Sequence, residues 1–320
     1  MSVGAAAVTG AAEGSRPASG GALEWAALLT VYIVWGSTYL GIRVVVMALP
    51  PLTSAGIRFA IAGGVMLLAV LASGRLRRRP GPRELLAAAA VGCLLLVSGN
   101  GFVSIGEQHV PSAMAALIIA SVPLWVIVLR RLAGQPVHRG TMVGVAVGFL
   151  GVGAMLVPIG LGGTVDPASL AILVVAAFSW ASGSFLATRL AMPRDPFVST
   201  AAQMLTAAAA LLVLGLGSGE RIDGAAVAAH PSSLLALAYL TVFGSLLAFT
   251  AYAWLLQHAP ISRVATYAYV NPLVAVILGA LILGESITPP ILVGGAIIVL
   301  AVALVIGQES RGAAAPELPG

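Results

Sequence analysis

The stretch Gln-His-Val-Pro at residues 108–111 recurs as Gln-His-Ala-Pro at residues 257–260. A second proline follows twelve residues after the proline of each copy, Pro123 in the first and Pro272 in the second. The two copies are about 145–150 residues apart, which is half of the hydrophobic part of the chain. A repeat with this period predicts a fold made of two related units.

The composition places both units in a membrane. Hydrophobic residues make up 59% of the 320 residues and charged residues only 8%, against about 25% charged in a typical globular protein. A helix needs about 20 apolar residues to span the hydrocarbon core. Such runs occupy residues 25–45, 52–72, 84–106, 111–131, 140–157, 168–190, 197–216, 232–256, 262–283 and 289–307. Because the runs are continuously apolar and do not alternate, they predict helices and not barrel strands.

The second unit is expected to be inverted relative to the first, because each unit contains five runs, an odd number of crossings. The segment between the third and fourth runs carries Glu107 in the first unit and Arg263 in the second. The segment after the fourth run carries arginines within 130–139 in the first unit and Glu285 in the second. Since arginine accumulates in cytoplasmic loops, we predict an all-α polytopic membrane protein of ten transmembrane helices in two inverted five-helix repeats.

The arginines also orient the chain. With the N-terminus in the cytoplasm, the inside segments contain Arg16, Arg75, Arg77, Arg78, Arg79, Arg83, Arg130, Arg131, Arg139, Arg189, Arg194, Arg263 and Arg311. Of the others, Arg221 lies in an outside loop, Arg43 near an outer helix end and Arg58 within a run. Both termini are therefore predicted to be cytoplasmic. The expected divisions are a disordered tail at 1–23, a first repeat at 24–157, a second repeat at 168–307 and a disordered tail at 308–320.

Further motifs occur in the order found in one family of transporters. They are Trp35-Gly36-Ser37-Thr38-Tyr39, Pro51 to Phe59, Gly99-Asn100-Gly101, Val110-Pro111-Ser112, Ser179-Trp180-Ala181, Tyr267 to Pro272 and Gly284-Glu285. With these motifs the chain resembles the EamA-type permeases of the drug/metabolite transporter superfamily, and among them the inner-membrane exporters of the YedA type. The resemblance implies a central cavity formed mainly by helices 1, 3, 4, 6, 8 and 9, with helices 5 and 10 packed outside it.

Polar and aromatic side chains inside the runs are candidates for that cavity, because polar groups are costly in hydrocarbon and often mark solute pathways. Several share one helix face at spacings of three, four or seven residues. Such faces suit amphipathic or aromatic solutes through stacking and hydroxyl contacts, and packing between helices is the alternative use. The candidates are Trp35, Thr38, Tyr39, Asn100, Trp180, Ser184, Ser245, Tyr252, Tyr267 and Asn271.

Arg58 lies about 9 Å into the second helix at helical rise. Two roles are open to it, an anchor that snorkels outward and an outer gate paired with a carboxylate such as Glu107 or Glu285. Pro123 and Pro272 predict kinks in the fourth and ninth helices, because proline lacks the amide donor.

Other classes of function find little support in the residues. No histidine and carboxylate spacing forms a metal-ligand set, and neither a catalytic residue nor a cofactor site is expected. Ser182-Gly183-Ser184 superficially resembles an intramembrane hydrolase, but the four histidines lie in or beside loops, away from any buried serine. The net charge of +5 comes from arginines between apolar runs, which argues against nucleic-acid binding.

Inverted repeats place a solute site near the membrane midplane and open it alternately to the two sides. Together with the family resemblance, this predicts a secondary transporter of the bacterial inner membrane that exports small metabolites, amino-acid-like compounds or drugs. Its expected partners are the lipid bilayer and a small solute, and the fused repeat is expected to work as a monomer. A lipid or polyprenyl-carrier translocase on the same fold is the alternative function.

Overall fold

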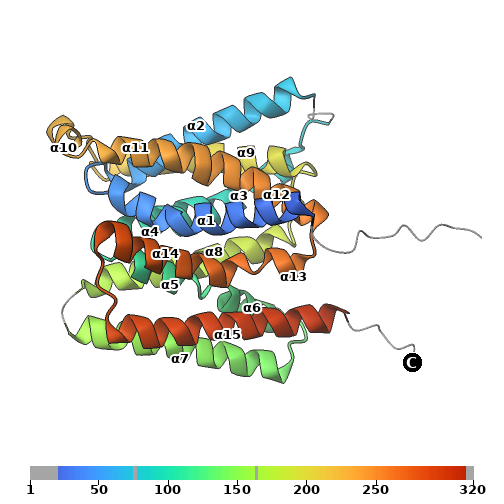
Figure 1. The fold of residues 1–320 in the computed structure, drawn as a ribbon. Helices are drawn as coiled ribbons and strands as arrows, with labels where there is room; N and C mark the ends of the chain where they lie inside the picture. Colours follow the sequence, from blue (N-terminus) through green and yellow to red (C-terminus); the bar gives the residue numbers. More distant parts are fainter. Residues whose placement is uncertain (1–20, 75–77, 163–164, 315–320) are drawn as a thin grey trace, which may run out of the picture.

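The computed structural model describes residues 21–74, 78–162 and 165–314, and every regular element in these ranges is helical. The expected N-terminal tail, residues 1–23, lies outside the described residues except for its last three. The helices run lengthwise in one bundle, and α1 (Ala22–Val45) begins at the end where α15 (Pro289–Ala314) finishes (Figure 1). We call this end of the bundle the terminal end and the other the distal end.

Six of the expected spans are single helices. Besides α1 and α15 they are α2 (Pro51–Ala72), α7 (Arg139–Leu161), α8 (Pro167–Ala187) and α9 (Pro196–Gly217). Four of the six begin with proline, which suits the first turn because an amide there has no partner within the helix. Asp166 and Asp195 cap α8 and α9 by accepting hydrogen bonds from amides of the first turn.

The third and eighth spans each contain a wider π-helical segment. The third consists of α3 (Pro82–Gly92), η1 (Cys93–Gly101) and α4 (Phe102–Gly106). The eighth consists of α11 (Ser232–Tyr239), η2 (Leu240–Leu247) and α12 (Ala248–His258). The two π-helices overlap when the copies are aligned on their Gln-His motifs. Such segments are frequent at functional sites, and hydropathy alone does not predict them.

The fourth and ninth spans are interrupted by turns. The fourth is α5 (Ser112–Ile119) and α6 (Val122–Leu132), and the ninth is α13 (Ile261–Val264) and α14 (Tyr267–Leu283). Pro123 lies in the first turn of α6, directly after the interruption at 120–121. The expected kink at Pro272 differs, because α14 continues through this proline and the turn comes earlier, at 265–266. A short helix, α10 (Gly224–Ala229), lies in the distal connection between α9 and α11.

Within the described ranges, nine helices are long and apolar enough to cross a membrane. The remaining expected span contains α14, whose 17 residues reach only about 25 Å at helical rise, against a hydrocarbon core of about 30 Å. The chain is thus an all-helical, polytopic membrane protein, and the number ten stays a prediction.

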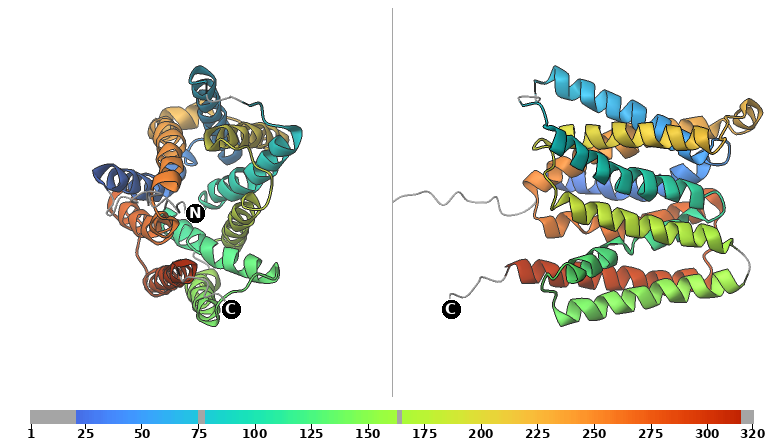
Figure 2. Two further views of the ribbon diagram at one scale, coloured as in Figure 1. Left: turned by 90° about the vertical axis from the view of Figure 1, so that its right-hand side faces the viewer. Right: turned by 180° about the vertical axis from the view of Figure 1, so that it is seen from behind.

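We call residues 24–157 the first copy and residues 168–307 the second copy. Helices of the first copy pack chiefly against helices of the second. The pairs in contact include α2 with α9, α7 with α15, α1 with α14, and α8 with η1. Seen end-on, most helices form a ring, with α7 and α15 side by side at its edge (Figure 2, left). This arrangement places α7 and α15 outside the ring, as the family resemblance implies for helices 5 and 10.

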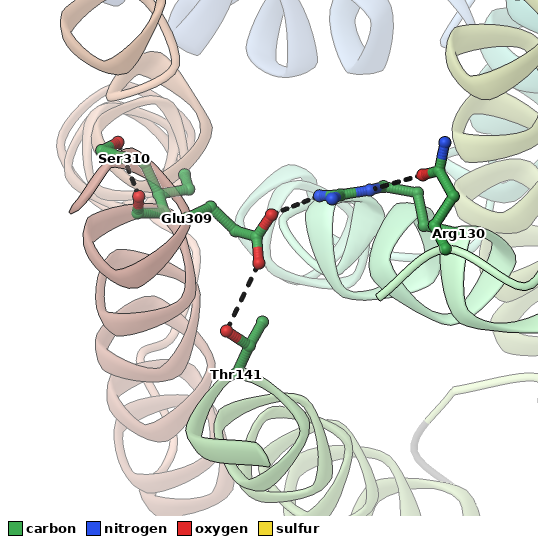
Figure 3. Close-up of polar contacts among 6 residues, drawn as sticks. Arg130, Thr141, Glu309 and Ser310 are labelled. Atoms are coloured by element: carbon green, nitrogen blue, oxygen red, sulfur yellow. Dashed lines mark hydrogen bonds and ion pairs between the residues drawn. The ribbon is translucent and has the colours of Figure 1, made fainter. Parts of the chain in front are cut away.

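At the terminal end, an ionic contact joins three helices (Figure 3). Arg130 on α6 forms an ion pair with Glu309 on α15, and Thr141 on α7 donates a hydrogen bond to the same carboxylate at 3.3 Å. Arg130 Nε also donates to Gln135 Oε1 at 2.9 Å. Residues 308–314 of the expected C-terminal tail are therefore helical, because Glu309 gains a cation and a hydroxyl partner on neighbouring helices. A second ion pair at this end joins Glu24 on α1 to Arg263 on α13.

At the distal end, two glutamates from the second copy cap helices of the first. Glu285 accepts from the amides of Ser112 and Ala113 at the start of α5, at 2.8 and 2.9 Å. Glu220 accepts from the amides of Leu52 and Thr53 at the start of α2, at 3.1 and 2.7 Å. Each carboxylate satisfies two orphan donors and meets the positive end of a helix dipole.

Glu107, at the end of α4, is a buried carboxylate without such partners. Its residue is 0% exposed, and neither carboxylate oxygen accepts a hydrogen bond from the described protein. Arg43 donates to its backbone carbonyl oxygen and not to its side chain. Burial raises the pKa of the Glu107 carboxyl well above the usual range, nearby Glu285 raises it further, and Arg43 opposes both.

Removing the distal caps is expected to destabilise the fold. Glu220→Ala and Glu285→Ala should each lower the free energy of unfolding by about 1–2 kcal/mol, because each leaves two helix-start amides unpaired. The double variant should lose about the sum, since the two caps share no partner. Equilibrium unfolding in detergent micelles measures this. Arg78→Ala is the control, because its ion pair with Glu84 is exposed and spans 3.4 Å. Caps no costlier than this control would contradict the assignment.

The buried Glu107 is expected to make stability depend on pH. A raised pKa means that the native state holds the proton more tightly than the unfolded state, so its stabilising effect is lost as pH rises through the native pKa. Between about pH 5 and about pH 8, the melting temperature of the wild type should therefore fall relative to that of Glu107→Gln, which cannot ionise. Parallel melting curves across this range would show that folding does not raise the pKa of the Glu107 carboxyl.

Candidate functional site

A cavity of about 110 Å³ lies between the two copies. Since a water needs about 10–15 Å³ on this measure, the space accommodates several waters or part of a small solute. Its wall comes from α1, α2, η1, α4, α5, α6, α8, α12 and α14. Neither α7 nor α15 contributes a lining residue.

Most of the candidates named from the sequence line this cavity. They are Trp35, Thr38, Tyr39, Arg58, Asn100, Pro123, Trp180, Tyr267, Asn271 and Pro272. Four others do not line it. Ser245 is fully buried behind Arg58, and Tyr252 packs against the rings of Trp35 and Tyr267. Ser184 on α8 and Glu107 at the distal end lie outside the lining.

One wall is aromatic and centres on Trp35. The ring centroid of Trp35 lies 5.1 Å from that of Phe249 and 5.3 Å from that of Tyr267, both in edge-on geometry. Its indole Nε1 donates to the carbonyl oxygen of Gly244 at 3.2 Å. This hydrogen bond fixes the indole against η2 and α12, so the wall presents ring faces and edges that suit an apolar or aromatic group.

The charged group of the cavity lining is a single guanidinium, that of Arg58. Arg58 is 4% exposed, and its Nε donates to Ser245 Oγ at 2.8 Å. Its Cζ lies 4.9 Å from the ring centroid of Phe59. A Cβ on residue 244 would lie 3.3 Å from Arg58 Nη2, so glycine there leaves room for the side chain. The sequence left two arrangements open for Arg58. In the described protein its side chain neither snorkels outward nor forms an ion pair with Glu107.

Two amides complete the polar lining. Asn100 Oδ1 is buried without a hydrogen-bond partner in the described protein. Turned to satisfy both of its amide atoms, Asn271 donates to the carbonyl oxygens of Tyr32 and Tyr267 at 3.2 Å each. Asn271 therefore joins α14 to α1, while Asn100 keeps an acceptor unused. Next to Asn100, Gly99 lets η1 approach the Trp180 ring on α8 closely, because a Cβ on residue 99 would lie 2.9 Å from that ring.

Phe249 and Phe59 are lining residues that the candidates omitted. The repeat contains a signal for the first of them. Aligning the two Gln-His motifs sets Phe249 opposite Asn100, just as Pro272 is set opposite Pro123. Phe59 carries no such signal, because an apolar residue beside Arg58 reads equally well as lipid-facing or packed.

The described cavity offers one cation, one free amide oxygen, hydroxyls and aromatic rings, and its wall includes no acidic side chain. Within the described residues, no three His, Cys, Asp or Glu side chains gather into a possible metal site. The arrangement can hold a small molecule through polar contacts on one side and ring contacts on the other.

The sequence matches the model of the EamA-like transporter family twice, over residues 23–157 and 168–307. It is 38% identical over 284 residues to "Uncharacterized inner membrane transporter YedA" of Escherichia coli K12, covering 87% of this chain and 89% of that protein. It is 28% identical to the "Probable terminal-alkyne amino-acid exporter" of Streptantibioticus cattleyicolor, covering 88% and 92%. It is also 25% identical to the "Probable amino-acid metabolite efflux pump" of Salmonella typhimurium, covering 84% and 90%.

A solved crystal structure shares the fold at a TM-score of 0.60 and 19% identity, covering 90% of this chain and 98% of the other. The resemblance read from the motifs is confirmed, because the family matches nearly the whole helical region and the YedA relative is similar over most of both chains. The chain is a multi-pass transporter of the inner membrane and belongs to the EamA-like transporter family.

Proposed function

We propose that this protein is a secondary transporter that exports small amphipathic solutes, amino-acid-like compounds among them, by alternating access. The observation that carries the proposal is the cavity between the copies, whose polar and aromatic groups come from both. Asn100 and Pro123 of the first copy face the same space as their counterparts Phe249 and Pro272, and Trp35 of the first copy faces it together with Trp180 of the second. A site at the interface of two inverted repeats is the arrangement that rocking of one repeat against the other exposes to each side in turn.

Contacts at both ends of the bundle are consistent with such rocking. Glu24 and Arg263 join the two copies at the terminal end, while the caps of Glu220 and Glu285 join them at the distal end. Opening the cavity to one side requires the contacts at that end to loosen while those at the other end hold. We further propose ten membrane-spanning helices in two inverted repeats, with both termini cytoplasmic.

Amino-acid-like solutes fit the chemistry of the wall. The unpaired Oδ1 of Asn100 accepts a hydrogen bond from an N–H group, and the rings around Trp35 accommodate an apolar side chain. Two relatives bear names that refer to amino-acid export, which supports the same class of solute here.

Export should depend on the two cavity amides. Comparative metabolite profiling of media from deletion and overexpression strains identifies the exported solute, and its efflux rate is then compared between variants. Asn100→Ala and Asn271→Ala should each lower efflux about tenfold at unchanged membrane levels, the loss expected for one buried hydrogen bond. Gln203→Ala is the matched control, because this amide bonds Ser199 on α9 and does not line the cavity. Unchanged efflux in both asparagine variants would contradict the proposed site.

The proposed topology has its own test. Reporter fusions in the arginine-rich segment 75–83 should report the cytoplasm, and fusions within 217–230 should report the opposite side, because an odd number of crossings separates them. Fusions that place the two segments on the same side would contradict the inverted arrangement.

A further inference from the structure

Arg58 is a buried cation without an acidic partner in the described protein. The ion pairs of the described residues involve Arg78, Arg130 and Arg263, all at the terminal end. Arg58 lies in a membrane-spanning helix instead, and it is 4% exposed. A buried charge is costly unless it is paired and hydrogen-bonded. The described protein therefore lacks the anion that would balance the charge of Arg58.

The guanidinium is nevertheless held in one place. Ser245 Oγ accepts from Nε, and the guanidinium lies against the ring of Phe59. A guanidinium has five N–H donors in a planar fork, and the described protein takes up only the one on Nε. Both terminal nitrogens are left without a protein acceptor while the residue lines the cavity.

We propose that Arg58 is the subsite for a carboxylate of the transported solute, with Ser245 as the residue that positions the guanidinium. A carboxylate has the planar, two-oxygen geometry that a guanidinium fork binds in bidentate fashion. It supplies the negative charge that the cavity wall lacks. The proposal rests on the proposed function, because it assigns a role in solute binding to the same cavity.

The balance of charge favours a carboxylate over a phosphate. Among the lining residues, Arg58 is the one charged side chain, and it neutralises a monoanion fully. A phosphate monoester has close to two negative charges at neutral pH, and the diphosphate of a lipid carrier has more. Either would introduce an uncompensated charge into a wall that is otherwise neutral, which costs free energy in a site of low dielectric.

Binding of a matched pair of probes to the purified full-length protein tests the proposal. The pair is 3-phenylpropionate and 3-phenylpropionamide, which share a ring and a chain but differ in charge. The acid should bind at least about tenfold more tightly than the amide, the ratio of a charge-assisted hydrogen bond. A third probe, 2-phenylethyl phosphate, should bind more weakly than the acid. Isothermal titration calorimetry gives all three dissociation constants.

Variants locate the preference. Arg58→Met should reduce the ratio of acid to amide affinity to about one, while Arg58→Lys should retain part of it, because a lysine keeps the charge without the fork. Ser245→Ala should lower the ratio a few-fold and remains informative if Arg58→Met fails to fold. Arg43→Met is the matched control, since it removes an arginine of α1 that lies outside the cavity lining, and it should leave the ratio unchanged.

Several outcomes would overturn the proposal. They are equal binding of acid and amide, a preference that persists in Arg58→Met, and no binding of either probe at millimolar concentration. Tighter binding of the phosphate would overturn the carboxylate assignment in favour of phosphate-bearing solutes, lipid carriers included. The subsite and the export function can fail separately. If the exported solute has no acidic group, the carboxylate subsite is contradicted and the export function is not. If the protein prefers the acid but cells show no solute efflux, the export function is contradicted and the subsite is not.

Discussion

A backbone amide or carbonyl in hydrocarbon must find its hydrogen bond within the protein, and this requirement governs where the helices are regular. α7 and α15 run without interruption and contribute nothing to the cavity. The spans with π-helical segments or turns all contribute lining residues, through η1, α5, α6, α12 and α14, and the uninterrupted α1, α2 and α8 complete the wall. Irregular backbone is tolerated there because it borders a polar space and protein, not lipid. The irregular backbone and the cavity thus occur together in the interior of the bundle.

The two halves that match the family model contribute unlike side chains to the cavity. Positions that correspond in the two copies face the same space but have diverged, since Asn100 in η1 is matched by Phe249 in α12. One copy therefore supplies a hydrogen-bonding group where the other supplies a ring. A cavity of this kind orients an amphipathic solute without needing symmetry in the solute itself.

The sequence predicts the long helices well, because about 20 apolar residues between breakers admit few other structures. It also predicts most of the polar and aromatic lining residues, because such groups are costly or uncommon inside helices that face hydrocarbon. It does not predict the contact between Arg58 and Ser245, which joins residues 187 positions apart and depends on how α2 packs on η2. Nor does it predict that Glu309 belongs to a helix, because a short polar stretch at a chain end looks like a tail until its partner Arg130 is known. Local pattern fixes elements, while contacts between distant elements require the packed structure.

The distal caps also bear on how the protein is made. Both capping carboxylates, those of Glu220 and Glu285, lie in the second copy. The helices that they cap, α2 and α5, lie in the first. A ribosome releases the chain from its N-terminus, and domains commonly fold in that order during synthesis. The starts of α2 and α5 therefore lack these caps until residues 220 and 285, respectively, have been synthesised. Part of the hydrogen bonding of the first half thus depends on the second half.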